Sequence, residues 1–376
     1  MTPLPFIDLR PGDNDAEVRA AIDRVINRGW FVLGPEVEAF EQEFADACGA
    51  RHAVSCGNGT DAIALLLRAL GIGAGDEVIV PAMTAAYTGL AVMMAGARPV
   101  FADVDPDTLT MDPGACAAVV TTRTRAIVPV HLYGQAADLD ALAAIASRHG
   151  LALVEDCCQG HGATAKGVPV GTRGAGGAFS FYPTKNLGAL GDGGAVITGD
   201  AALADRIRRL RNGGQSDRYH HVEAGINSRL DEMQAAILRA KLPHLPAWTS
   251  RRRALAASYR RQLGPGTAPI VERHSGHVYH LFPVRTPDRD ALQASLRAAG
   301  IETLIHYPVP LPAQAAFAAA RASATQAPGR VDTEYPVAAR AARELLSLPL
   351  HPALRDSDVD RVAAAVNAFA KGRVPA

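Results

Sequence analysis

The sequence predicts an α/β protein, with a mixed, mostly parallel sheet in a large domain and a smaller C-terminal α+β domain. Short apolar runs typical of strands alternate with helical patterns through the middle of the chain. The 376 residues exceed what one hydrophobic core usually serves, so we expect two domains. Because 48% of the residues are hydrophobic, the chain can bury sizeable cores and does not have the composition of a disordered protein.

The expected strands of the large domain are six apolar runs. They are 77–82, 98–104, 125–132, 151–156, 177–182 and 194–198. Helical patterns at 60–70, 88–97 and 139–150 separate the earlier runs, and this order is typical of parallel strands with helices on both faces. No helical pattern separates the last two runs, so we expect that pair to be antiparallel and the sheet to be mixed.

Helical spacing dominates after about residue 200. The expected helices are 200–212, 228–245, 246–263, 288–300 and 355–372, with a β-type run at 277–286. The alanine-rich stretch 313–330 fits a helix followed by a loop. We expect the domain boundary in the helix at 246–263, so that residues 1–250 form the large domain with the N-terminal segment and residues 251–376 form the small one.

The net charge and the cysteine content indicate which binding partners and which cellular compartment to expect. The net charge is zero, which offers nothing to attract nucleic acid or an acidic membrane surface. No apolar run approaches the roughly 18 to 20 residues of a membrane helix, and the N-terminus lacks the regions of a signal peptide. The five cysteines are an odd number, so we expect a reducing cytoplasm rather than a disulfide framework. Cys157 and Cys158 are adjacent, without zinc-binding spacing, and are interpreted as packing residues, so no metal site is expected.

Lys185 is the first candidate for chemistry. It lies in "SFYPTKNLGALGDGGAVIT" (180–198), between an apolar run and a glycine-rich turn. The chain has only four lysines against 34 arginines. Arginine stays protonated and cannot form an imine, so a lysine kept in this background favours amine chemistry. The alternative is an ordinary solvated surface lysine.

Asp156 and a glycine-containing turn are the next candidates. Asp156 ends a buried-type strand, and ligands of parallel sheets lie beyond the carboxyl ends of strands, where a carboxylate can pair with a protonated ring nitrogen. The alternative is a cap on the following turn. Gly57, Gly59 and Thr60 precede a strong helical pattern, and backbone N–H groups at such a position bind phosphate. The alternative there is an ordinary helix cap formed by Asn58 or Thr60.

Two further polar residues complete a set. Ser180 lies at the end of a strand, five residues before Lys185, where its hydroxyl could reach the same phosphate. Asn227 precedes the expected helix at 228–245, and its alternative role is to cap that helix. Together the candidates meet the needs of pyridoxal phosphate: a lysine for the Schiff base, a carboxylate for the ring nitrogen and a phosphate site. The glycines of 188–194 do not form a dinucleotide fingerprint, because they lead into a strand.

Five motifs carry a family resemblance over almost the whole chain. They are "GNGTDAIALLL", "HLYGQAADLDAL", "VEDCCQGHGA", "SFYPTKNLGALGDGGAVIT" and "GINSRLDEMQAAIL". The chain resembles the DegT/DnrJ/EryC1/StrS-type sugar aminotransferases. This resemblance implies the fold of aspartate-aminotransferase-like (fold type I) pyridoxal 5′-phosphate enzymes and a homodimer with active sites at the subunit interface.

The resemblance also implies a role for each candidate residue. Lys185 would form the Schiff base, Asp156 would pair with the pyridinium nitrogen, and Gln159 would lie near the ring hydroxyl. Gly59, Thr60 and Ser180 would hold the phosphate, and Asn227 would reach the phosphate of the other subunit's site. Related dehydratases carry histidine in place of the lysine, so Lys185 favours transamination.

One position departs from the family pattern. Similar proteins often have an aromatic residue after the threonine of the "PAxT" stretch, where it stacks on the cofactor ring. This chain has Ala85 there, in "PAMTAAYTG", and Tyr87 follows two residues later. The choice of stacking residue is therefore open.

The substrate is also expected from resemblance. The stretches "FYPTKNLGALGDGG", "NGGQSDRYHHVEAGINSRLDE" and "HYPVPL" are most similar to the branch that aminates C-3 of dTDP-linked 3-keto-6-deoxyhexoses, with glutamate as amino donor. The C-4 branch is the nearest alternative. The substrate candidates are Tyr182, His220, His221, His306 and Tyr307, each of which could instead be structural. Because some relatives were first described as regulators, a cofactor- or sugar-binding protein without turnover is the alternative from another class.

Overall fold

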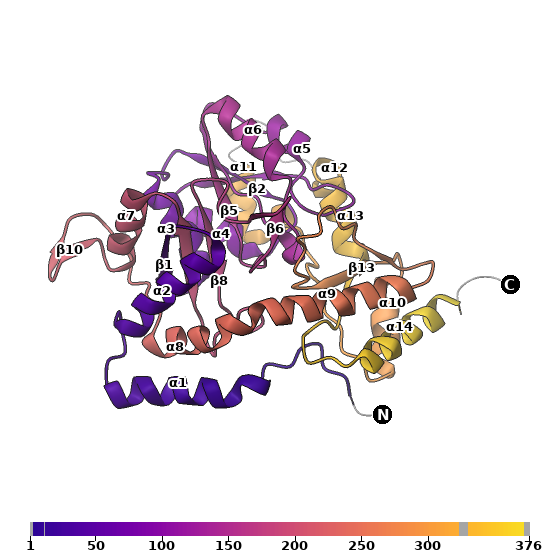
Figure 1. Cartoon of the computed structure of the whole chain (residues 1–376). Helices are drawn as coiled ribbons and strands as arrows, with labels where there is room; N and C mark the ends of the chain where they lie inside the picture. Colours follow the sequence, from indigo (N-terminus) through magenta and orange to yellow (C-terminus); the bar gives the residue numbers. More distant parts are fainter. Residues whose placement is uncertain (1–2, 11, 323–329, 372–376) are drawn as a thin grey trace.

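A seven-stranded sheet forms the centre of the fold in the computed structural model, which describes residues 3–10, 12–322 and 330–371 (Figure 1). The strand order is β1-β9-β8-β5-β4-β2-β3. The strands are β1 (His52–Cys56), β2 (Glu77–Pro81), β3 (Arg98–Ala102), β4 (Thr124–Ile127), β5 (Ala152–Asp156), β8 (Gly176–Ser180) and β9 (Gly194–Thr198). β9 lies antiparallel between β8 and β1, whereas the other neighbours are parallel. The expected mixed sheet is confirmed, and β1 adds an edge strand that the sequence analysis missed.

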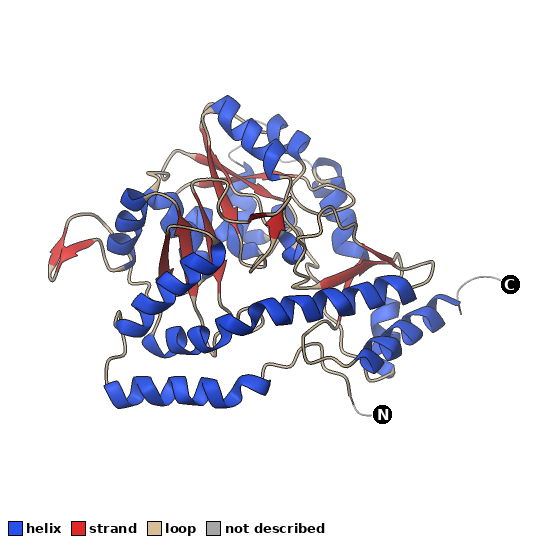
Figure 2. Cartoon of the chain, viewed as in Figure 1, coloured by secondary structure: helices blue, strands red, loops and turns tan. Residues whose placement is uncertain are grey.

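Helices cover both faces of this sheet, as expected (Figure 2). The helices on one face are α3 (Gly59–Ala69), α4 (Ala86–Met94) and α7 (Ala201–Arg211). Those on the other face are α2 (Pro35–Cys48), α5 (Pro113–Ala118), α6 (Leu139–His149) and α8 (Glu232–Lys241). Successive strand residues alternate between the faces, so Val78 and Val80 join the core under α3 while Ile79 joins the core under α6.

Local side chains and glycines set the ends of several helices. Asn58 caps α3 by accepting a 2.9 Å hydrogen bond from the N–H of Asp61, and Asp200 caps α7 in the same way. Gly150 ends α6 in the left-handed conformation, with φ at 64°, which a residue without a Cβ adopts at no steric cost.

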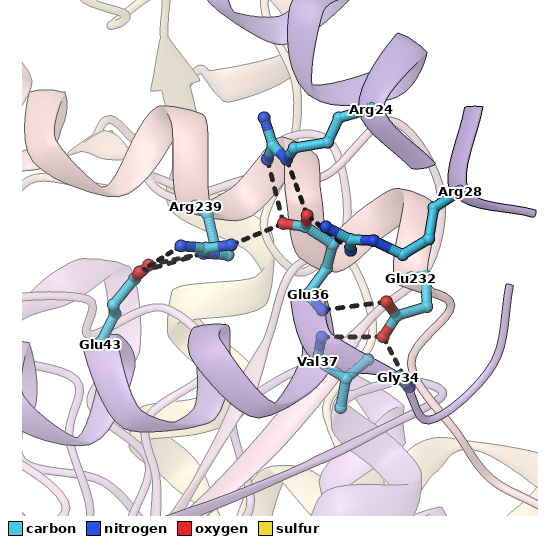
Figure 3. Close-up of polar contacts among 8 residues, drawn as sticks. All are labelled: Arg24, Arg28, Gly34, Glu36, Val37, Glu43, Glu232 and Arg239. Carbon is cyan, nitrogen blue, oxygen red and sulfur yellow. Dashed lines mark hydrogen bonds and ion pairs between the residues drawn. The ribbon is translucent and has the colours of Figure 1, made fainter. Parts of the chain in front are cut away.

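Glu232 ties the start of α8 to the start of α2 (Figure 3). Its buried carboxylate accepts hydrogen bonds from the N–H groups of Gly34 at 2.8 Å, Glu36 at 2.9 Å and Val37 at 2.9 Å. These N–H groups have no partner within α2, because the first turn of a helix leaves its donors free. A negative charge at this end also interacts favourably with the helix dipole.

Glu36 joins the same junction to α1 (Asp15–Arg28), as Figure 3 shows. Its side chain is only 1% exposed and forms ion pairs with Arg24 at 2.7 Å, Arg239 at 2.6 Å and Arg28 at 3.1 Å. The hydrogen bond from Arg24 and the other guanidinium groups lower the pKa of Glu36 to about 2, against the effect of its burial. Three helices are therefore held together by one buried carboxylate.

Two small hairpins form two-stranded sheets outside the central seven-stranded sheet. One joins β6 (Thr164–Ala165) to β7 (Val168–Pro169). The other joins β10 (Gln215–Asp217) to β11 (His220–His221) and projects away from the rest of the fold in Figure 1.

A separate core lies at the C-terminal end. It contains a three-stranded antiparallel sheet of β12 (Ala268–Pro269), β13 (Phe282–Arg285) and β14 (Leu345–Leu348). The helices packed on it are α9 (Leu245–Gln262), α10 (Arg289–Ala298) and α14 (Asp356–Lys371). Leu4 from the N-terminal segment joins this core, whereas Phe317 and α13 (Pro336–Glu344) join the core of the large sheet. The expected domain boundary falls within α9, and the division at residue 250 stays a prediction.

Several expected elements differ from the structure. The expected helix at 228–245 is shorter, because α8 begins at Glu232 and a 3₁₀ turn (Leu242–His244) follows it. Within the β-type run at 277–286, only β13 pairs as a strand. In the stretch 313–330, short 3₁₀ turns lead to α11 (Ala318–Ala322), and the expected loop lies largely at 323–329, outside the described residues. The short helix α12 (Val331–Glu334) follows. None of the helices in the described ranges is both long and apolar enough to cross a bilayer.

Candidate active site

A cavity of about 780 Å³ lies where β5 and β8 end and α3 begins. Its wall comes from α3, α4, the loops after β5 and β8, and two segments beyond α9. The expected site residues that line it are Gly59, Thr60, Asp156, Gln159, Ser180, Tyr182, Lys185, His306 and Tyr307. The fold therefore gathers residues that are up to 249 positions apart, from Asn58 to Tyr307, into one space.

The amine of Lys185 has no hydrogen bond or ion pair with any described residue, although the side chain is half-buried. Other lysines are engaged: Lys241 donates to the carbonyl of Gly188 at 2.7 Å, and Lys166 pairs with Asp140 at 2.7 Å. Burial lowers the pKa of the Lys185 amine, against the opposite effect of Cys158 and Asp156. Burial also lowers the pKa of Lys241, so the amine without a partner is what distinguishes Lys185, and a solvated surface role does not fit it.

Asp156 is a buried carboxylate without a basic partner among the described residues. It is only 4% exposed, at the end of β5. The hydroxyl of Thr88 donates to its Oδ2 at 2.7 Å, and the N–H of Cys158 donates to its Oδ1 at 3.0 Å. The second bond is the turn cap that was the alternative interpretation, and it is present. Neutral donors hold the carboxylate, but its charge is still free to pair with a cationic group in the cavity.

The start of α3 offers unpaired N–H groups to the cavity. The backbone N–H groups of Gly59 and Thr60 have no hydrogen-bond acceptor among the described residues. The side chain of Asn58 accepts from the N–H of Asp61 instead. A Cβ on Gly59 would lie 2.7 Å from the Cβ of Ser180 and 2.8 Å from the Sγ of Cys158, so only glycine allows this approach. The cap by Asn58 is therefore present, and the N–H groups of Gly59 and Thr60 remain free to bind an anion. Gly57 does not line the cavity, and its N–H donates to Ser228.

Gln159 is oriented by a hydrogen-bond network on the other side of the cavity. Its Oε1 accepts from the N–H of Tyr133 at 2.6 Å, so its Nε2 faces the hydroxyl of Tyr307 and donates to it at 2.9 Å. The hydroxyl of Tyr133 donates to the carbonyl of His306 at 2.5 Å. Burial lowers the pKa of His306 to about 4 and raises the pKa of Tyr307, so both are neutral hydrogen-bonding groups near neutral pH.

Three expected residues do not line the cavity of their own chain. His220 and His221 are exposed on the β10–β11 hairpin, and Asn227 is exposed on the segment before α8. The interpretation of Asn227 as a helix cap is wrong, because α8 begins at Glu232 and Asp231 occupies the cap position. Tertiary contacts hold the preceding residues out of the helix, including the bond from Gly57 to Ser228 and a bridge between Asn227 and Asn212.

Ala85 and Tyr87 both line the cavity, at the start of α4. Ala85 offers only a methyl group, whereas Tyr87 carries a ring that is 65% exposed in this chain. The aromatic surface that this helix can offer a planar ligand therefore comes from Tyr87.

Thr88 and His280 also line the cavity, although neither is among the residues expected from the sequence. Thr88 lies 68 positions before the carboxylate that it contacts, and His280 lies beyond α9. No local pattern marks either residue, since each reaches the site only through the packing of distant elements.

His131, Glu155 and Cys157 lie close enough together to suggest a metal site, and all three are buried. Protein partners account for this cluster, however. The Nδ1 of His131 accepts from the N–H of Ala137 at 3.1 Å, so its Nε2 carries the proton and donates to Glu155 at 2.9 Å. Glu155 also accepts from the N–H of Gly171 at 2.7 Å. The His131–Glu155 pair therefore links the segment after β4 to the connection between β7 and β8.

The comparisons with known proteins agree with this geometry. The sequence profile described as the DegT/DnrJ/EryC1/StrS aminotransferase family matches residues 13–367. The chain is 49% identical over 373 residues to dTDP-3-amino-3,4,6-trideoxy-alpha-D-glucose transaminase of Streptomyces venezuelae, covering 98% of this chain and 96% of the relative. The crystal structure of S. venezuelae DesV in complex with a ketimine intermediate has a TM-score of 0.95 and 48% identity, with 100% of both chains covered. The structure of NtdA from Bacillus subtilis with bound cofactor PMP has a TM-score of 0.90 and 30% identity, covering 99% of this chain and 86% of that chain.

The expected fold class and the resemblance drawn from five motifs are both confirmed. The two solved structures are similar over nearly all of this chain, and the mostly parallel sheet with helices on both faces agrees with them. The profile match likewise spans most of the sequence, from before α1 to within α14. This chain therefore belongs to the DegT/DnrJ/EryC1/StrS aminotransferase family.

Proposed function

We propose that this chain is an aminotransferase that converts a nucleotide-linked keto-6-deoxyhexose, best represented by a dTDP-linked 3-keto sugar, into its amino sugar. The observation that carries the proposal is the unpaired amine of Lys185 in one cavity with the carboxylate of Asp156 and the free N–H groups of α3. This combination offers a nucleophile, a charge for a cationic ring and an anion site within one cavity.

The cavity fits pyridoxal 5′-phosphate, the cofactor of this family. The N–H groups of Gly59 and Thr60 and the hydroxyl of Ser180 would hold the phosphate, because the close packing of Gly59 on Ser180 brings these donors together at the cavity. Asp156 would face the ring nitrogen, and the Nε2 of Gln159 would lie near the ring hydroxyl. When bound, the cofactor supplies an aldehyde that condenses with amines and a protonated ring that withdraws electrons from the adjacent carbon.

Lys185 and Asp156 would have different roles in the reaction. Because burial lowers its pKa, a larger share of the Lys185 amine is unprotonated than in an exposed lysine, so it can attack a carbonyl carbon. With the cofactor bound to the amino donor, the Lys185 amine would act as a general base at the donor's Cα and as a general acid at the carbon that came from the cofactor's aldehyde. The negative charge of Asp156 favours the proton on the ring nitrogen throughout.

The substrate class rests on relatives and on the cavity wall. The S. venezuelae relative is named for an amino group at C-3 of a dTDP sugar, which supports C-3 over C-4 amination. Tyr182 and Tyr307 offer hydroxyl groups, and His306 offers a neutral imidazole, that can bond to sugar hydroxyls. We propose glutamate as the amino donor, following the family resemblance.

A second copy of the chain would complete the site. Lys185 is the one cationic side chain among the described residues that line the cavity, although the proposed substrates are a dicarboxylate and a diphosphate sugar. The projecting β10–β11 hairpin carries His220, His221 and the exposed Arg218, and Asn227 follows it. We propose a homodimer in which this segment reaches the partner's cavity, with Asn227 at the phosphate.

The same features bear on the remaining alternatives. Membership of an aminotransferase family and a complete set of lysine, carboxylate and anion site favour an enzyme over a binding protein without turnover. The five cysteines are free thiols. Free thiols support the proposal of a reducing cytoplasm as the compartment.

The test is an amino-transfer assay on the purified protein. We expect dTDP-3-keto-6-deoxyglucose and L-glutamate to give an amine at C-3, located by NMR, together with an equal amount of 2-oxoglutarate. Matched reactions contain the 4-keto sugar or the UDP-linked sugar, and Lys185→Ala is the control protein. An amine at C-4 would favour the alternative branch, and cofactor binding without amino transfer from any of these pairs would contradict the proposal.

A further inference from the structure

His280 shares the wall of the cavity with Lys185, yet none of the roles given above uses it. It is 7% exposed and lies in the segment between α9 and β13. Asn186, which follows Lys185 directly, is 5% exposed and faces the His280 ring. Through this buried contact, Asn186 connects the backbone beside Lys185 to the imidazole of His280.

The neighbours of Asn186 determine where His280 carries its proton. The Nδ2 of Asn186 donates to the carbonyl of Val278 at 3.1 Å, so its Oδ1 faces the ring. The Nδ1 of His280 lies 3.4 Å from that oxygen and must therefore donate to it. In a neutral imidazole the proton on Nδ1 leaves Nε2 as an acceptor, and the only hydrogen bond of this ring with a described residue is the one at Nδ1.

The surroundings keep the imidazole neutral. Burial lowers the pKa of His280 well below its ordinary value, and the positive charges of Lys185 and Arg252 lower it further. The other titratable groups that face it are His306 and His161, and burial lowers the pKa of each of these as well. Burial therefore disfavours the charged form of both Lys185 and His280, and the imidazole of His280 stays neutral near neutral pH.

We propose that His280 is a positioning residue for Lys185: its Nε2 accepts a hydrogen bond from the Lys185 nitrogen whenever that nitrogen carries a proton. The amine must take a proton from one carbon and return one to another, and an acceptor on the cavity wall would hold the ammonium in one orientation between the two transfers. An acceptor with no positive charge favours the protonated form of the lysine, opposite to the effect of burial. The proposal rests on the proposed function, since it assigns Lys185 these proton transfers.

Two conservative variants separate the two ring nitrogens. In His280→Asn the side-chain amide can replace Nδ1 and keep the bond to Asn186, but the acceptor at Nε2 is lost. In His280→Gln the longer amide can place its oxygen where Nε2 was, while the donor to Asn186 is lost. Both variants remove the same ring, so a general effect on packing would appear in both.

The first measurement is the pH titration of the visible absorption of the cofactor-loaded protein without amino donor, which reports the protonation of the Lys185 nitrogen. We expect the midpoint to fall by roughly one pH unit in His280→Asn, because a hydrogen bond to the charged form is lost. The midpoint should stay near that of the wild type in His280→Gln. An unchanged midpoint in His280→Asn, or an equal fall in both variants, would overturn the proposal.

The second measurement is the exchange of the Cα hydrogen of L-glutamate with deuterium from solvent. We expect exchange to slow by roughly 10- to 100-fold in His280→Asn and to be largely kept in His280→Gln. The reverse order would show that only the contact with Asn186 matters and would overturn the proposal. If the wild-type protein loads no cofactor on Lys185, the proposed function itself fails, and that result differs from every outcome above.

Discussion

The hydroxyl of Thr88 donates a hydrogen bond of 2.7 Å to the Oδ2 of Asp156, joining the first turn of α4 to the end of β5. Both side chains are buried, and both belong to the wall of the cavity. The bond fixes the rotamer of the carboxylate and leaves its charge unneutralised. Thr88 therefore helps to set the orientation of Asp156, the proposed partner of the ring nitrogen, toward the cavity.

Replacement of Thr88 tests this relationship. Thr88→Val keeps the shape but removes the donor, and we expect turnover to fall by roughly 10- to 100-fold, since bonds to charged groups contribute about 1.5–3 kcal/mol. Thr88→Ser keeps a hydroxyl and should lose much less. Steady-state rates with cofactor content measured in parallel check this prediction. Equal rates in the valine and serine variants would mean that the hydroxyl has no part in the reaction.

Borohydride reduction should attach the cofactor to Lys185. The amine of Lys185 is unpaired among the described residues, whereas Lys166 and Lys241 are held by Asp140 and Gly188. Peptide mapping of the reduced protein should recover the label at residue 185. Lys185→Ala should abolish turnover and keep the circular dichroism spectrum of the wild type. A label on Lys166 or Lys241 would refute the assignment of the nucleophile.

Mixed dimers test whether Asn227 serves the partner's site. Subunits carrying Lys185→Ala and subunits carrying Asn227→Ala should each be weak or inactive alone. In a mixed dimer one site collects both defects and the other is whole, so activity should recover toward a fraction of the wild-type rate as subunits exchange. Native mass spectrometry verifies the exchange. Exchange without recovery would exclude a shared site.

His161 should make the stability of the fold depend on pH. Its side chain is 1% exposed, and neither ring nitrogen has a hydrogen-bond partner in the part of the chain that the structure describes. Burial, together with the charge of Lys185, lowers its pKa to about 3, whereas a histidine of an unfolded chain titrates near 6.5. Between these values the unfolded chain binds more protons, so the contribution of His161 is complete above about pH 6.5 and is lost as the pH falls toward 3.

Denaturant unfolding between about pH 7 and pH 5 measures this dependence. The free energy of unfolding should fall with decreasing pH, and His161→Leu should reduce the slope by up to about 1.4 kcal/mol per pH unit. The same slope in both proteins would show that His161 does not stay neutral in the fold.

Glu232 should matter for stability although it lies outside the cavity. Glu232→Ala leaves three N–H groups of the α2 start without their acceptor, and we expect a loss of about 3 kcal/mol or more in the free energy of unfolding. Glu232→Gln keeps one carbonyl oxygen and should lose less. Urea midpoints of the three proteins give the comparison. An alanine variant as stable as the wild type would contradict the capping role shown in Figure 3.

The sequence predicted those parts of the site that depend on local pattern. Lys185, Asp156 and Gly59 stand where apolar runs meet turns, so the end of a strand or the start of a helix could be located from neighbouring residues. Thr88 and His280 could not be found in this way, because their positions depend on how α4 and the segment after α9 pack on the sheet. The residues that could be predicted are placed by their sequence neighbours, whereas Thr88 and His280 are placed by contacts with residues far away in the sequence.

The start of α8 shows why a pattern can mislead. The apolar spacing of 228–245 includes Leu230, which is buried, but as part of the loop before the helix. Ser228 is held by Gly57, and Asp231 forms a bridge with Val32, so long-range contacts took these residues from the helix. β1 was missed for a related reason, since the polar His52 and Ser55 interrupt its short apolar run and only pairing with β9 makes it a strand.

The position of β9 between β8 and β1 also sets an order of events during synthesis of the chain. Residues 52–56 leave the ribosome about 140 residues before their partner strand at 194–198, which is roughly 7 to 30 s at about 5–20 residues per second. Until then the nascent chain carries unpaired strand edges, which are prone to wrong pairing and attract chaperones. Lys185 lies in the connection from β8 to β9, so it is placed only when the sheet closes. A nascent chain stalled before that point would hold no active amine and would expose the edge along which it could aggregate.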